Sequence, residues 1–378
     1  MDKQSTSANI PSDLRTIELA PYGDKGGQGK VYRTNHQRYL IKVWDPFEMP
    51  RNVQAARLEA KRKFRTFSRL RFSCESELRC LPLDYREIDT QPAYVMQCAE
   101  GFDMAEEWKN LQELGLAQRL RICKSAADGL SVLHGRMVVH ADIKLDNLFF
   151  DPRSDSVAIL DLDGGGYCGK EPNTDQFAPS AIPGPLFMPP DMLKMGALAG
   201  RNPWPGIWTR EDRRKQPDLW ALAVLIYLIL TDERPFPKES FGDKWFVNED
   251  PEWPVEAQRA RFAQIGIRDE LIRLFCQTFG SRNRTQKNYR CIDARTWSGV
   301  LGKILAVSQP SAVECPKCHA RFTHVSYSFC PKCSEQGLMT ALWGYATCPM
   351  EHRTPAKSPG MERVFCIHCG REVKRDHL

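Results

Sequence analysis

The chain has 378 residues, of which 42% are hydrophobic and 26% are charged, a composition that is ordinary for a soluble globular protein. This length is enough for one large two-lobed unit and something smaller, and the composition excludes a chain that is disordered throughout. A net charge of +6 is too small to indicate nucleic-acid binding by itself. No apolar stretch reaches the ~18 residues of a membrane-spanning helix, and the polar N-terminus has no apolar signal segment, so we expect a cytoplasmic protein.

Residues 1–13 are polar, and we expect a flexible N-terminus followed by a β-rich segment over about 14–97. Short runs of β-branched and aromatic residues in this segment predict strands at 30–34, 38–44 and 93–97. A basic helix is predicted near 52–70. Its residues 57–71 include seven Arg or Lys and one Glu, which favours a solvated helix face; contact with an acidic partner is the alternative.

Helical periodicity dominates the middle of the chain. Apolar residues recur at helical spacing in 116–133, and Gly135 stands just beyond them, where glycine commonly ends a helix. The apolar run Trp220–Leu230 has the length of a buried core helix, whereas the Gly- and Pro-rich stretch 164–217 is predicted to be mostly irregular. After SQPS (308–311) the composition changes to Cys, His and Pro, which indicates a domain boundary.

Gly26, Gly27 and Gly29 cluster just before the first predicted strand, in the sequence YGDKGGQGKVY (22–32). Glycine lets backbone amides approach a phosphate because no Cβ lies in the way, although a plain hairpin turn has the same composition. Thirteen residues beyond Gly29, Lys42 lies inside an apolar strand, where its charge is costly to bury without a partner. A nucleotide phosphate and a carboxylate would offset that cost, and Glu59 is the only acid between Asn52 and Arg71.

The segment VVHADIKLDN (138–147) gathers Asp142, Lys144 and Asn147 in one short stretch. Fourteen residues after Asn147, the apolar run VAIL ends in Asp161, with Asp163 two positions on. Amide and carboxylate oxygens are ligands that suit Mg²⁺, and a free carboxylate nearby can accept a proton from a hydroxyl nucleophile. The pattern therefore predicts a cation site with a general base beside it.

Together these residues resemble the protein kinase superfamily over residues 14–306, in the order Gly-rich loop, strand Lys, helix Glu, HxDxKxxN and D-x-x-G. The resemblance implies an α+β fold of two lobes, a small β-rich N-lobe (about 14–97) and a large helical C-lobe (about 100–306). Small-molecule kinases of the aminoglycoside type lack four later landmarks that this chain shares with protein Ser/Thr kinases. They are GPLFMPPD (184–191), DLW (218–220), LTDERPF (230–236) and RCIDARTW (290–297).

The resemblance implies a role for each polar residue. Asp142 would be the catalytic base, and Lys144 would steady the γ-phosphate. Lys42 would hold the α- and β-phosphates and pair with Glu59, although Lys63 stands four residues later, where an apolar residue is usual. The residues expected to bind ATP are Gly26, Gly27, Gly29, Val31, Lys42, Gln97, Ala99, Asn147 and Asp161.

Asp161 and Asn147 are the expected ligands of Mg²⁺ (or Mn²⁺), and Asp163 stands where the family's D-F-G has Gly. A register shifted by two residues, with Asp163 as the main ligand, is the alternative. Ala141 replaces the Arg that precedes the catalytic Asp in many protein kinases. The resemblance therefore implies a non-RD kinase, which does not require phosphorylation of its activation loop.

The 14 cysteines are unevenly spread: seven lie among the last 64 residues, mostly in C-x-x-C pairs. In a cytoplasmic chain this pattern indicates metal rather than disulfides, and C-x2-C-x11-C-x2-C suits tetrahedral Zn²⁺. We expect residues 312–378 to form two zinc ribbons, about 312–336 and 345–373, with one or two structural Zn²⁺. The ligands of the first are Cys315, Cys318, Cys330 and Cys333. Those of the second, with His368 or a nearby acid as an alternative, are Cys348, His352, Cys366 and Cys369.

The leading hypothesis is an ATP-dependent Ser/Thr protein kinase whose zinc ribbons recruit a protein substrate or partner. Its architecture resembles bacterial kinases that accompany von Willebrand A proteins and Ser/Thr phosphatases in tellurium-resistance-type systems, which implies partners of these two kinds and no membrane. Two alternatives stay open. One is an ATP-binding pseudokinase that signals as a scaffold, and the other is a nucleic-acid-associated kinase that uses the ribbons and residues 57–71.

Overall fold

The computed structural model describes most of the first 308 residues and six short strands beyond them. The described ranges are 10–15, 29–44, 53–70, 81–99, 101–105, 108, 114–151, 156–170, 174–195, 200–236, 253–267, 269–280, 290–308, 313–314, 321–322, 345–347, 353–355, 364–365 and 372–373. The chain divides into two compact units, Met1–Leu301 and Gly302–Leu378. Within the described ranges, no helix is long and apolar enough to cross a membrane.

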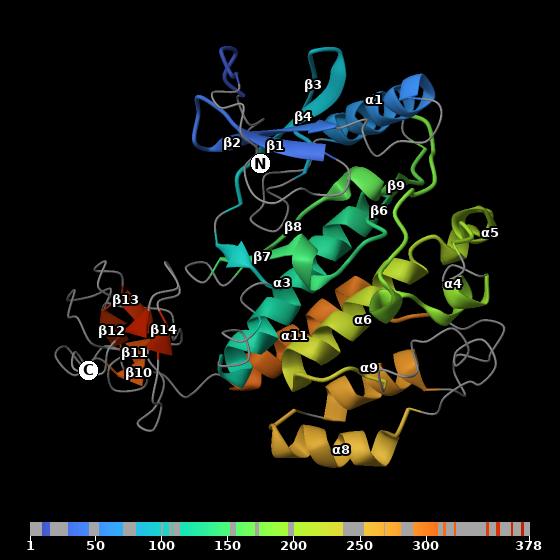
Figure 1. Ribbon diagram of the computed structural model, residues 1–378. Helices are drawn as coiled ribbons and strands as arrows, with labels where there is room; N and C mark the ends of the chain where they lie inside the picture. Colours follow the sequence, from blue (N-terminus) through green and yellow to red (C-terminus); the bar gives the residue numbers. More distant parts are fainter. Residues whose placement is uncertain are drawn as a thin grey trace, which may run out of the picture. The chain divides into compact units, whose positions relative to one another are not determined.

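A four-stranded antiparallel sheet forms one end of the first unit (Figure 1). Its order is β1 (Gly29–Arg33), β2 (Tyr39–Trp44), β4 (Gln91–Gln97) and β3 (Asp84–Ile88). Three of these strands were predicted to within two residues. In β2, Leu40 and Trp44 pack on one face of the sheet, while Tyr39, Ile41 and Val43 pack on the other, as strand alternation requires.

Helix α1 (Val53–Arg69) confirms the predicted basic helix and covers the Leu40 face of the sheet. Its inward stripe contains Ala60, Phe64 and Phe67, which recur at the spacing of one helical face. Most of its basic side chains are exposed or half-buried, as expected for a solvated face. Lys63 is the exception, because it lies on the inward stripe and is only 4% exposed.

The lower part of the first unit is built around α6 (Gln216–Thr231), in which every residue from Pro217 to Thr231 is buried. This confirms the buried core helix predicted at Trp220–Leu230. Aromatic rings pack against one another between α6 and the helices beside it: Tyr227, Trp253, Phe262, Phe275 and Phe279. The other long helices among the described residues of this part are α3 (Leu116–Gly135), α8 (Val255–Gln264), α9 (Asp269–Phe279) and α11 (Ala294–Ser308).

Helix α3 begins at Leu116 as predicted, but its end differs from the prediction. Gly135 is the last helical residue rather than the cap, and the positive φ that ends the turn, 60°, belongs to Met137. The backbone N–H of Arg136 donates to Val132 and Leu133, which completes the last turn of the helix. The chain then enters β6 (Val138–Val139).

Several short strands lie before and after β6 in the chain. β5 (Phe102–Asp103), β7 (Leu148–Asp151) and β8 (Ser156–Ile159) form one small sheet, and β6 pairs with β9 (Gly166–Tyr167). In the stretch 164–217, predicted to be mostly irregular, the residues that the structure describes hold β9 and four helical pieces of three to five residues. These pieces are η5 (Pro185–Phe187), α4 (Pro190–Lys194), α5 (Trp204–Trp208) and η7 (Glu211–Arg213).

Two glycines bring the chain before β9 and the segment 179–181 into close contact. A Cβ added at Gly164 would lie 2.3 Å from the Cβ of Ala181, and one added at Gly166 would lie 2.6 Å from Cδ of Pro179. Ser180 and Ala181 both donate their backbone N–H to the carbonyl of Gly164. This packing fixes Ser180 beside the residues of the candidate site described below.

In the second unit, the described residues form three two-stranded antiparallel sheets. They are β10 (Val313–Glu314) with β11 (Arg321–Phe322), β12 (Tyr345–Thr347) with β13 (Arg353–Pro355), and β14 (Val364–Phe365) with β15 (Glu372–Val373). All eight predicted zinc ligands lie outside the described residues. Among the residues that are described anywhere in the chain, no cluster of His, Cys, Asp or Glu forms a metal site by itself.

Candidate active site

The loop after β6 is held in place by Asp218, at the start of α6. The backbone N–H groups of His140 and Ala141 donate to the two oxygens of Asp218, at 2.8 and 2.7 Å. Ala141 has a φ of 73°, a left-handed conformation that costs energy for any residue with a Cβ. The buried carboxylate therefore stabilises a loop conformation that the backbone alone would disfavour.

Within this loop, Asp142, Lys144 and Asn147 contact one another. Nδ2 of Asn147 donates to the backbone oxygen of Asp142 at 2.7 Å and to its Oδ2 at 3.0 Å, and Nζ of Lys144 lies 3.0 Å from the same Oδ2. Because both amide hydrogens of Asn147 are used, its Oδ1 is the atom that can bind a cation. Burial alone would lower the pKa of Lys144, but its hydrogen bond to Asp142 and the surrounding carboxylates raise it above its ordinary value.

Asp161 lies next to this loop, because one backbone bond and one contact from a His side chain tie its neighbour Leu160 to the loop. The N–H of Leu160 donates to the carbonyl of Asn147 at 2.8 Å, and Nε2 of His140 lies 2.6 Å from the carbonyl of Leu160. The side chain of Asp161 is 36% exposed, whereas that of Asp163 is 3% exposed. This difference favours Asp161 as the cation ligand over the shifted register that would use Asp163.

Lys42 extends from β2 to both aspartates. Its Nζ lies 2.5 Å from Oδ1 of Asp161 and 2.7 Å from Oδ2 of Asp163. Burial alone would lower the pKa of Lys42, but the charges of Asp163 and Asp161 raise it above its ordinary value. Burial is the largest single influence on Asp161 and raises the pKa of this carboxyl, but the charge and hydrogen bond of Lys42, together with the charges of His140 and Lys144, outweigh it and lower the pKa below its ordinary value.

The predicted pair between Lys42 and Glu59 is not formed in this structure. The Glu59 side chain is 54% exposed and lies 3.7 Å from Nζ of Lys63, one helical turn along α1. The reason is the rotation of α1, whose inward stripe begins at Ala60 and leaves Glu59 at its edge. Lys63 takes the inward position instead, and its Nζ donates to Oγ of Ser180 at 2.8 Å.

Some of the residues expected to bind the nucleotide are described, and they lie on the β-sheet side of the site. Val31 and Ala99 pack with Leu40, Met96 and Leu160 in one apolar cluster, which offers a surface for a planar base. Gln97 is the last residue of β4. Gly29 is needed where β1 meets β2, since a Cβ there would lie 2.7 Å from the carbonyl oxygen of Val43. Gly26 and Gly27 lie outside the described residues.

Sequence reasoning did not single out Tyr94 as a site residue. Its hydroxyl donates to Oδ1 of Asp163 at 2.6 Å, and its ring packs edge to face on Phe64 of α1, with 4.7 Å between ring centroids. Tyr94 is the cross-strand partner of Lys42 in the sheet. A tyrosine in an apolar strand was the available signal, because a buried hydroxyl requires a hydrogen-bond partner.

His134 was also missed. Its Nε2 lies 3.0 Å from Oδ2 of Asp218, so this histidine adds a third contact to the carboxylate that holds the loop.

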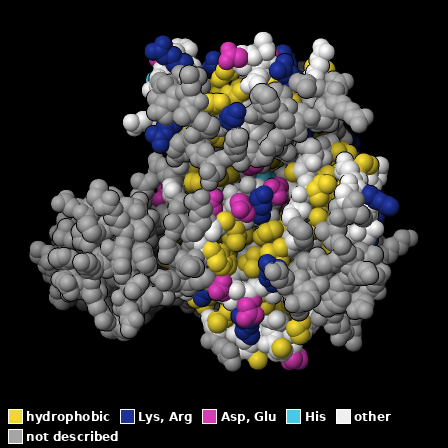
Figure 2. Space-filling model, viewed as in Figure 1, with side chains coloured by type: hydrophobic (Ala, Val, Ile, Leu, Met, Phe, Trp, Pro, Cys, Tyr) yellow, Lys and Arg dark blue, Asp and Glu magenta, His cyan; other side chains and the backbone are white. Residues whose placement is uncertain are grey.

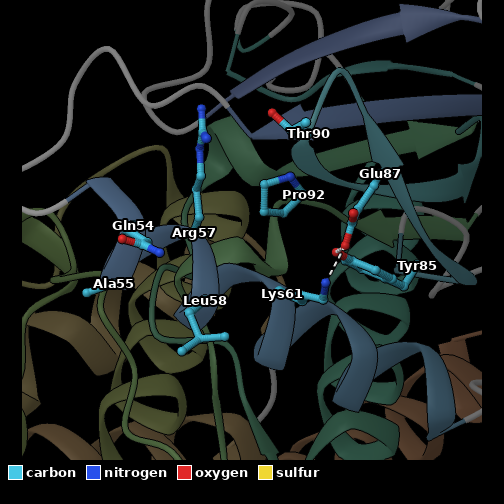
Figure 3. A pocket seen from close by; sticks show the side chains of 9 residues that line it. All are labelled: Gln54, Ala55, Arg57, Leu58, Lys61, Tyr85, Glu87, Thr90 and Pro92. Atoms are coloured by element: carbon cyan, nitrogen blue, oxygen red, sulfur yellow. Dashed lines mark hydrogen bonds and ion pairs between the residues drawn. The ribbon is translucent and has the colours of Figure 1, made fainter.

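Charged side chains of both signs gather near the centre of the face shown in Figure 2, below the sheet. A separate pocket lies between α1 and the hairpin of β3 and β4 (Figure 3). There Lys61 pairs with Glu87, which also accepts a hydrogen bond from the hydroxyl of Tyr85 at 2.6 Å. None of the expected catalytic residues lines this pocket, so it is distinct from the site built around Asp142.

The family model described as protein kinase domain matches residues 83–275, which is more than half of the chain. The β-sheet and the helical part of the first unit, together with the Asp142 loop, agree with this match. The chain therefore belongs to the protein kinase family. The matched span includes that loop and Asp161 but begins after Lys42. The assignment of Lys42 therefore depends on its geometry and its place in the sequence.

Curated relatives are protein kinases by name, and two of the three names below specify a Ser/Thr protein kinase. The chain is 25% identical over 231 residues to CBL-interacting protein kinase 25 of Oryza sativa subsp. japonica (59% of this chain, 41% of the relative). It is 24% identical over 233 residues to Serine/threonine-protein kinase atg1 of Dictyostelium discoideum (58% and 30%), and 27% identical over 123 residues to Serine/threonine-protein kinase shk2 of Schizosaccharomyces pombe (32% and 18%). The chain thus spans less than half the length of each of these relatives.

Proposed function

We propose that the protein is an ATP-dependent Ser/Thr protein kinase that transfers the γ-phosphate to protein hydroxyls. One observation carries the proposal: a single polar network joins Asp142, Lys144 and Asn147 of the loop to Asp161 and Lys42. The links are the contacts of Asp142 with its two loop partners, the Leu160–Asn147 backbone bond and the Lys42–Asp161 ion pair. These are the base, the phosphate-binding cations and the cation ligands that phosphoryl transfer requires.

In the proposed reaction, the substrate hydroxyl oxygen forms a bond to the γ-phosphorus while the bond between that phosphorus and the bridging oxygen of ADP breaks. The hydroxyl proton passes to the carboxylate of Asp142. Lys144, which lies 3.0 Å from Asp142, neutralises charge on the transferred group, and Lys42 binds the remaining phosphates.

The donor set also fits Mg²⁺. The free Oδ1 of Asn147 and the half-exposed carboxylate of Asp161 are hard oxygen ligands, and the backbone bond from Leu160 to Asn147 brings the two residues together. When bound there, the cation supplies positive charge to the phosphates during transfer.

The test is transfer of radiolabelled phosphate from ATP to the protein itself or to a generic protein. Asp142→Asn should lower the rate by about a hundredfold or more, because it removes the general base. Lys42→Met should lower it comparably through weaker phosphate binding. A wild-type rate no higher than that of these variants would contradict the enzyme and leave an ATP-binding scaffold.

We also propose that the kinase is of the non-RD type. Ala141 is 1% exposed and has no charge, so no cation at this position needs a phosphorylated activation loop to neutralise it. The loop is supported instead by Asp218, which is present whether or not the chain is phosphorylated.

For the second unit, we propose two zinc ribbons that recruit a substrate or partner. Three predicted ligand pairs fall between strands that pair with each other: Cys315 and Cys318 between β10 and β11, Cys348 and His352 between β12 and β13, and Cys366 and Cys369 between β14 and β15. Ligand pairs carried by short hairpins are typical of zinc ribbons.

Elemental analysis of the purified protein should find one or two Zn²⁺ per chain. The paired change Cys315→Ser and Cys318→Ser should remove at least one of them. A metal-free, folded second unit would contradict the proposal.

Among partners, we propose a von Willebrand A protein and a Ser/Thr phosphatase, on the basis of the architecture alone. Binding of such a partner should be lost on deleting residues 312–378, whereas autophosphorylation should remain. A labelled nucleic acid that binds the chain in a salt-dependent manner, and only with those residues present, would favour the nucleic-acid-associated alternative.

A further inference from the structure

The geometry points to Asp163, rather than an acid of α1, as the permanent partner that positions Lys42 for the nucleotide. This inference rests on the proposed kinase function. It assigns to Asp163 the positioning of Lys42, which was expected of Glu59. It starts from the environment of Lys42, whose side chain is 8% exposed and so requires a negative partner in every state of the site.

Asp163 has an ion pair at one oxygen and a hydrogen bond at the other. Oδ2 lies 2.7 Å from Nζ of Lys42, and Oδ1 accepts the hydroxyl of Tyr94 at 2.6 Å. Lys42 and Tyr94 are directly opposite each other on neighbouring strands, so the sheet presents both to the same carboxylate. Phe64 of α1 packs on the Tyr94 ring and fixes it.

Asp161 cannot fill this role while it also binds a cation. Its side chain is the more exposed of the two, and it adjoins Asn147, the other expected cation ligand. A carboxylate that contacts Mg²⁺ shares its charge with the metal, which weakens its hold on Lys42. Asp163, which is buried and accepts a hydrogen bond from Tyr94, keeps Lys42 in place when Asp161 binds the cation.

A third carboxylate at Lys42 would be unfavourable. Two are already within 2.7 Å of its Nζ, and adding Glu59 would place three negative charges around one buried cation. The inward position on α1 is taken by Lys63, which already donates to Ser180. The helix thus contributes a cation to this side of the site, and the segment after β8 contributes the acid.

The experiment compares Asp163→Asn with the matched variant Glu59→Gln. Asn keeps the shape of the side chain and the acceptor for Tyr94 but removes the charge. We expect Asp163→Asn to weaken binding of a fluorescent ATP analogue with Mg²⁺ by about tenfold, and to lower kcat/KM by about a hundredfold. Glu59→Gln should stay within about twofold of the wild type in both. Analogue binding is measured without turnover, so it tests Asp163 even if phosphate transfer fails.

Three further measurements separate positioning from folding and from metal binding. In a Lys42→Met background, Asp163→Asn should add no further loss, because it acts through that lysine. Tyr94→Phe should give a smaller loss in the same direction. The Mg²⁺ concentration for half-maximal binding should rise for Asp161→Asn and stay unchanged for Asp163→Asn.

Two results would overturn the inference. An equal or larger loss in Glu59→Gln, which changes an exposed side chain and leaves folding intact, would mean that α1 supplies the partner when nucleotide binds. A raised Mg²⁺ requirement in Asp163→Asn would make Asp163 a metal ligand. If Asp163→Asn does not fold, Glu59→Gln and Tyr94→Phe still decide the question.

Discussion

Asp142, Lys144 and Asn147 contact one another within six consecutive residues, whereas Lys42 meets partners that lie 119 and 121 positions further along the chain. The first group is held by its own loop and by one carboxylate of α6. The second is assembled from β2, β4, α1 and the segment after β8. When residues are close in sequence, the chain itself largely determines which side chains contact one another. The group around Lys42, called the assembled side below, depends instead on how each helix and strand is rotated.

The largest expected effect is on the loop that carries Asp142, when the carboxylate of Asp218 that holds it is removed. Asp218→Ala leaves the buried N–H groups of His140 and Ala141 without an acceptor and removes the support of a left-handed residue. We expect the free energy of unfolding to fall by about 3 kcal/mol and phosphate transfer to fall by about a hundredfold. Denaturant unfolding and initial rates provide the two measurements.

Asp218→Asn is the control, because it retains one acceptor oxygen and should lose clearly less of both quantities. Equal losses in the two variants would mean that the charge, and not the hydrogen bonds to the loop, is what matters.

On the assembled side, Lys63 offers a smaller effect of opposite sign. Burial lowers the pKa of this lysine, although the charges of Glu59 and Asp163 oppose the shift. Replacing a buried charge with an apolar side chain of similar length should stabilise the domain, by about 1–2 kcal/mol for Lys63→Met at neutral pH.

The pH dependence follows from the same shift. Between the folded and the unfolded pKa of Lys63, the unfolded chain binds more protons, so the wild type gains stability as the pH rises through that window. The advantage of Lys63→Met should therefore shrink toward pH ~10, near the unfolded pKa. Thermal unfolding across this range measures it, and Lys61→Met, which alters a more exposed lysine, should show no such trend. If the stability advantage of Lys63→Met over the wild type grew as the pH rose, the pKa of Lys63 would not be lowered.

The smallest effect is expected in the segment that links the two sides. Thr174 and Ser180 are the only hydroxyl residues of Ser or Thr type between Asp161 and Asp191. Because Ala141 requires no phosphorylated partner, replacing both with Ala should change turnover by less than about tenfold, or ~1.4 kcal/mol of barrier. Steady-state rates of the double variant test this, and a larger loss would show that one of these hydroxyls, or its phosphorylation, is required.

The elements with strong periodicity were predictable from the sequence. The start of α3 and three of the four sheet strands agree with their predicted places within one or two residues, and the predicted core run Trp220–Leu230 lies entirely inside α6. β3 (DYREI) was missed because its residues are partly buried and mostly polar, so neither an apolar run nor strict alternation marks it. The loop residues Asp142, Lys144 and Asn147 were found because their spacing is local.

The partner of Lys42 was not predictable from proximity in the sequence. Glu59 was chosen because it is the only acid in its helix. The rotation of α1, however, is set by the buried side chains of Ala60, Phe64 and Phe67, and Glu59 lies outside this stripe. That stripe was readable beforehand, and it contains Lys63. The meeting of Asp163 with Tyr94 depends on the packing of distant segments, for which the sequence carries only the hint of a buried hydroxyl.

The clamp of Asp163 by Lys42 and Tyr94 also has an evolutionary consequence. If an acid on α1 is not needed, natural selection acts on that helix only through its apolar stripe and its cation. Among homologues of this chain, position 59 should drift freely, whereas the residues at 94 and 163 should change together. A homologue with glycine at 163 should show, in the same sequence, an acidic residue on the inward face of α1.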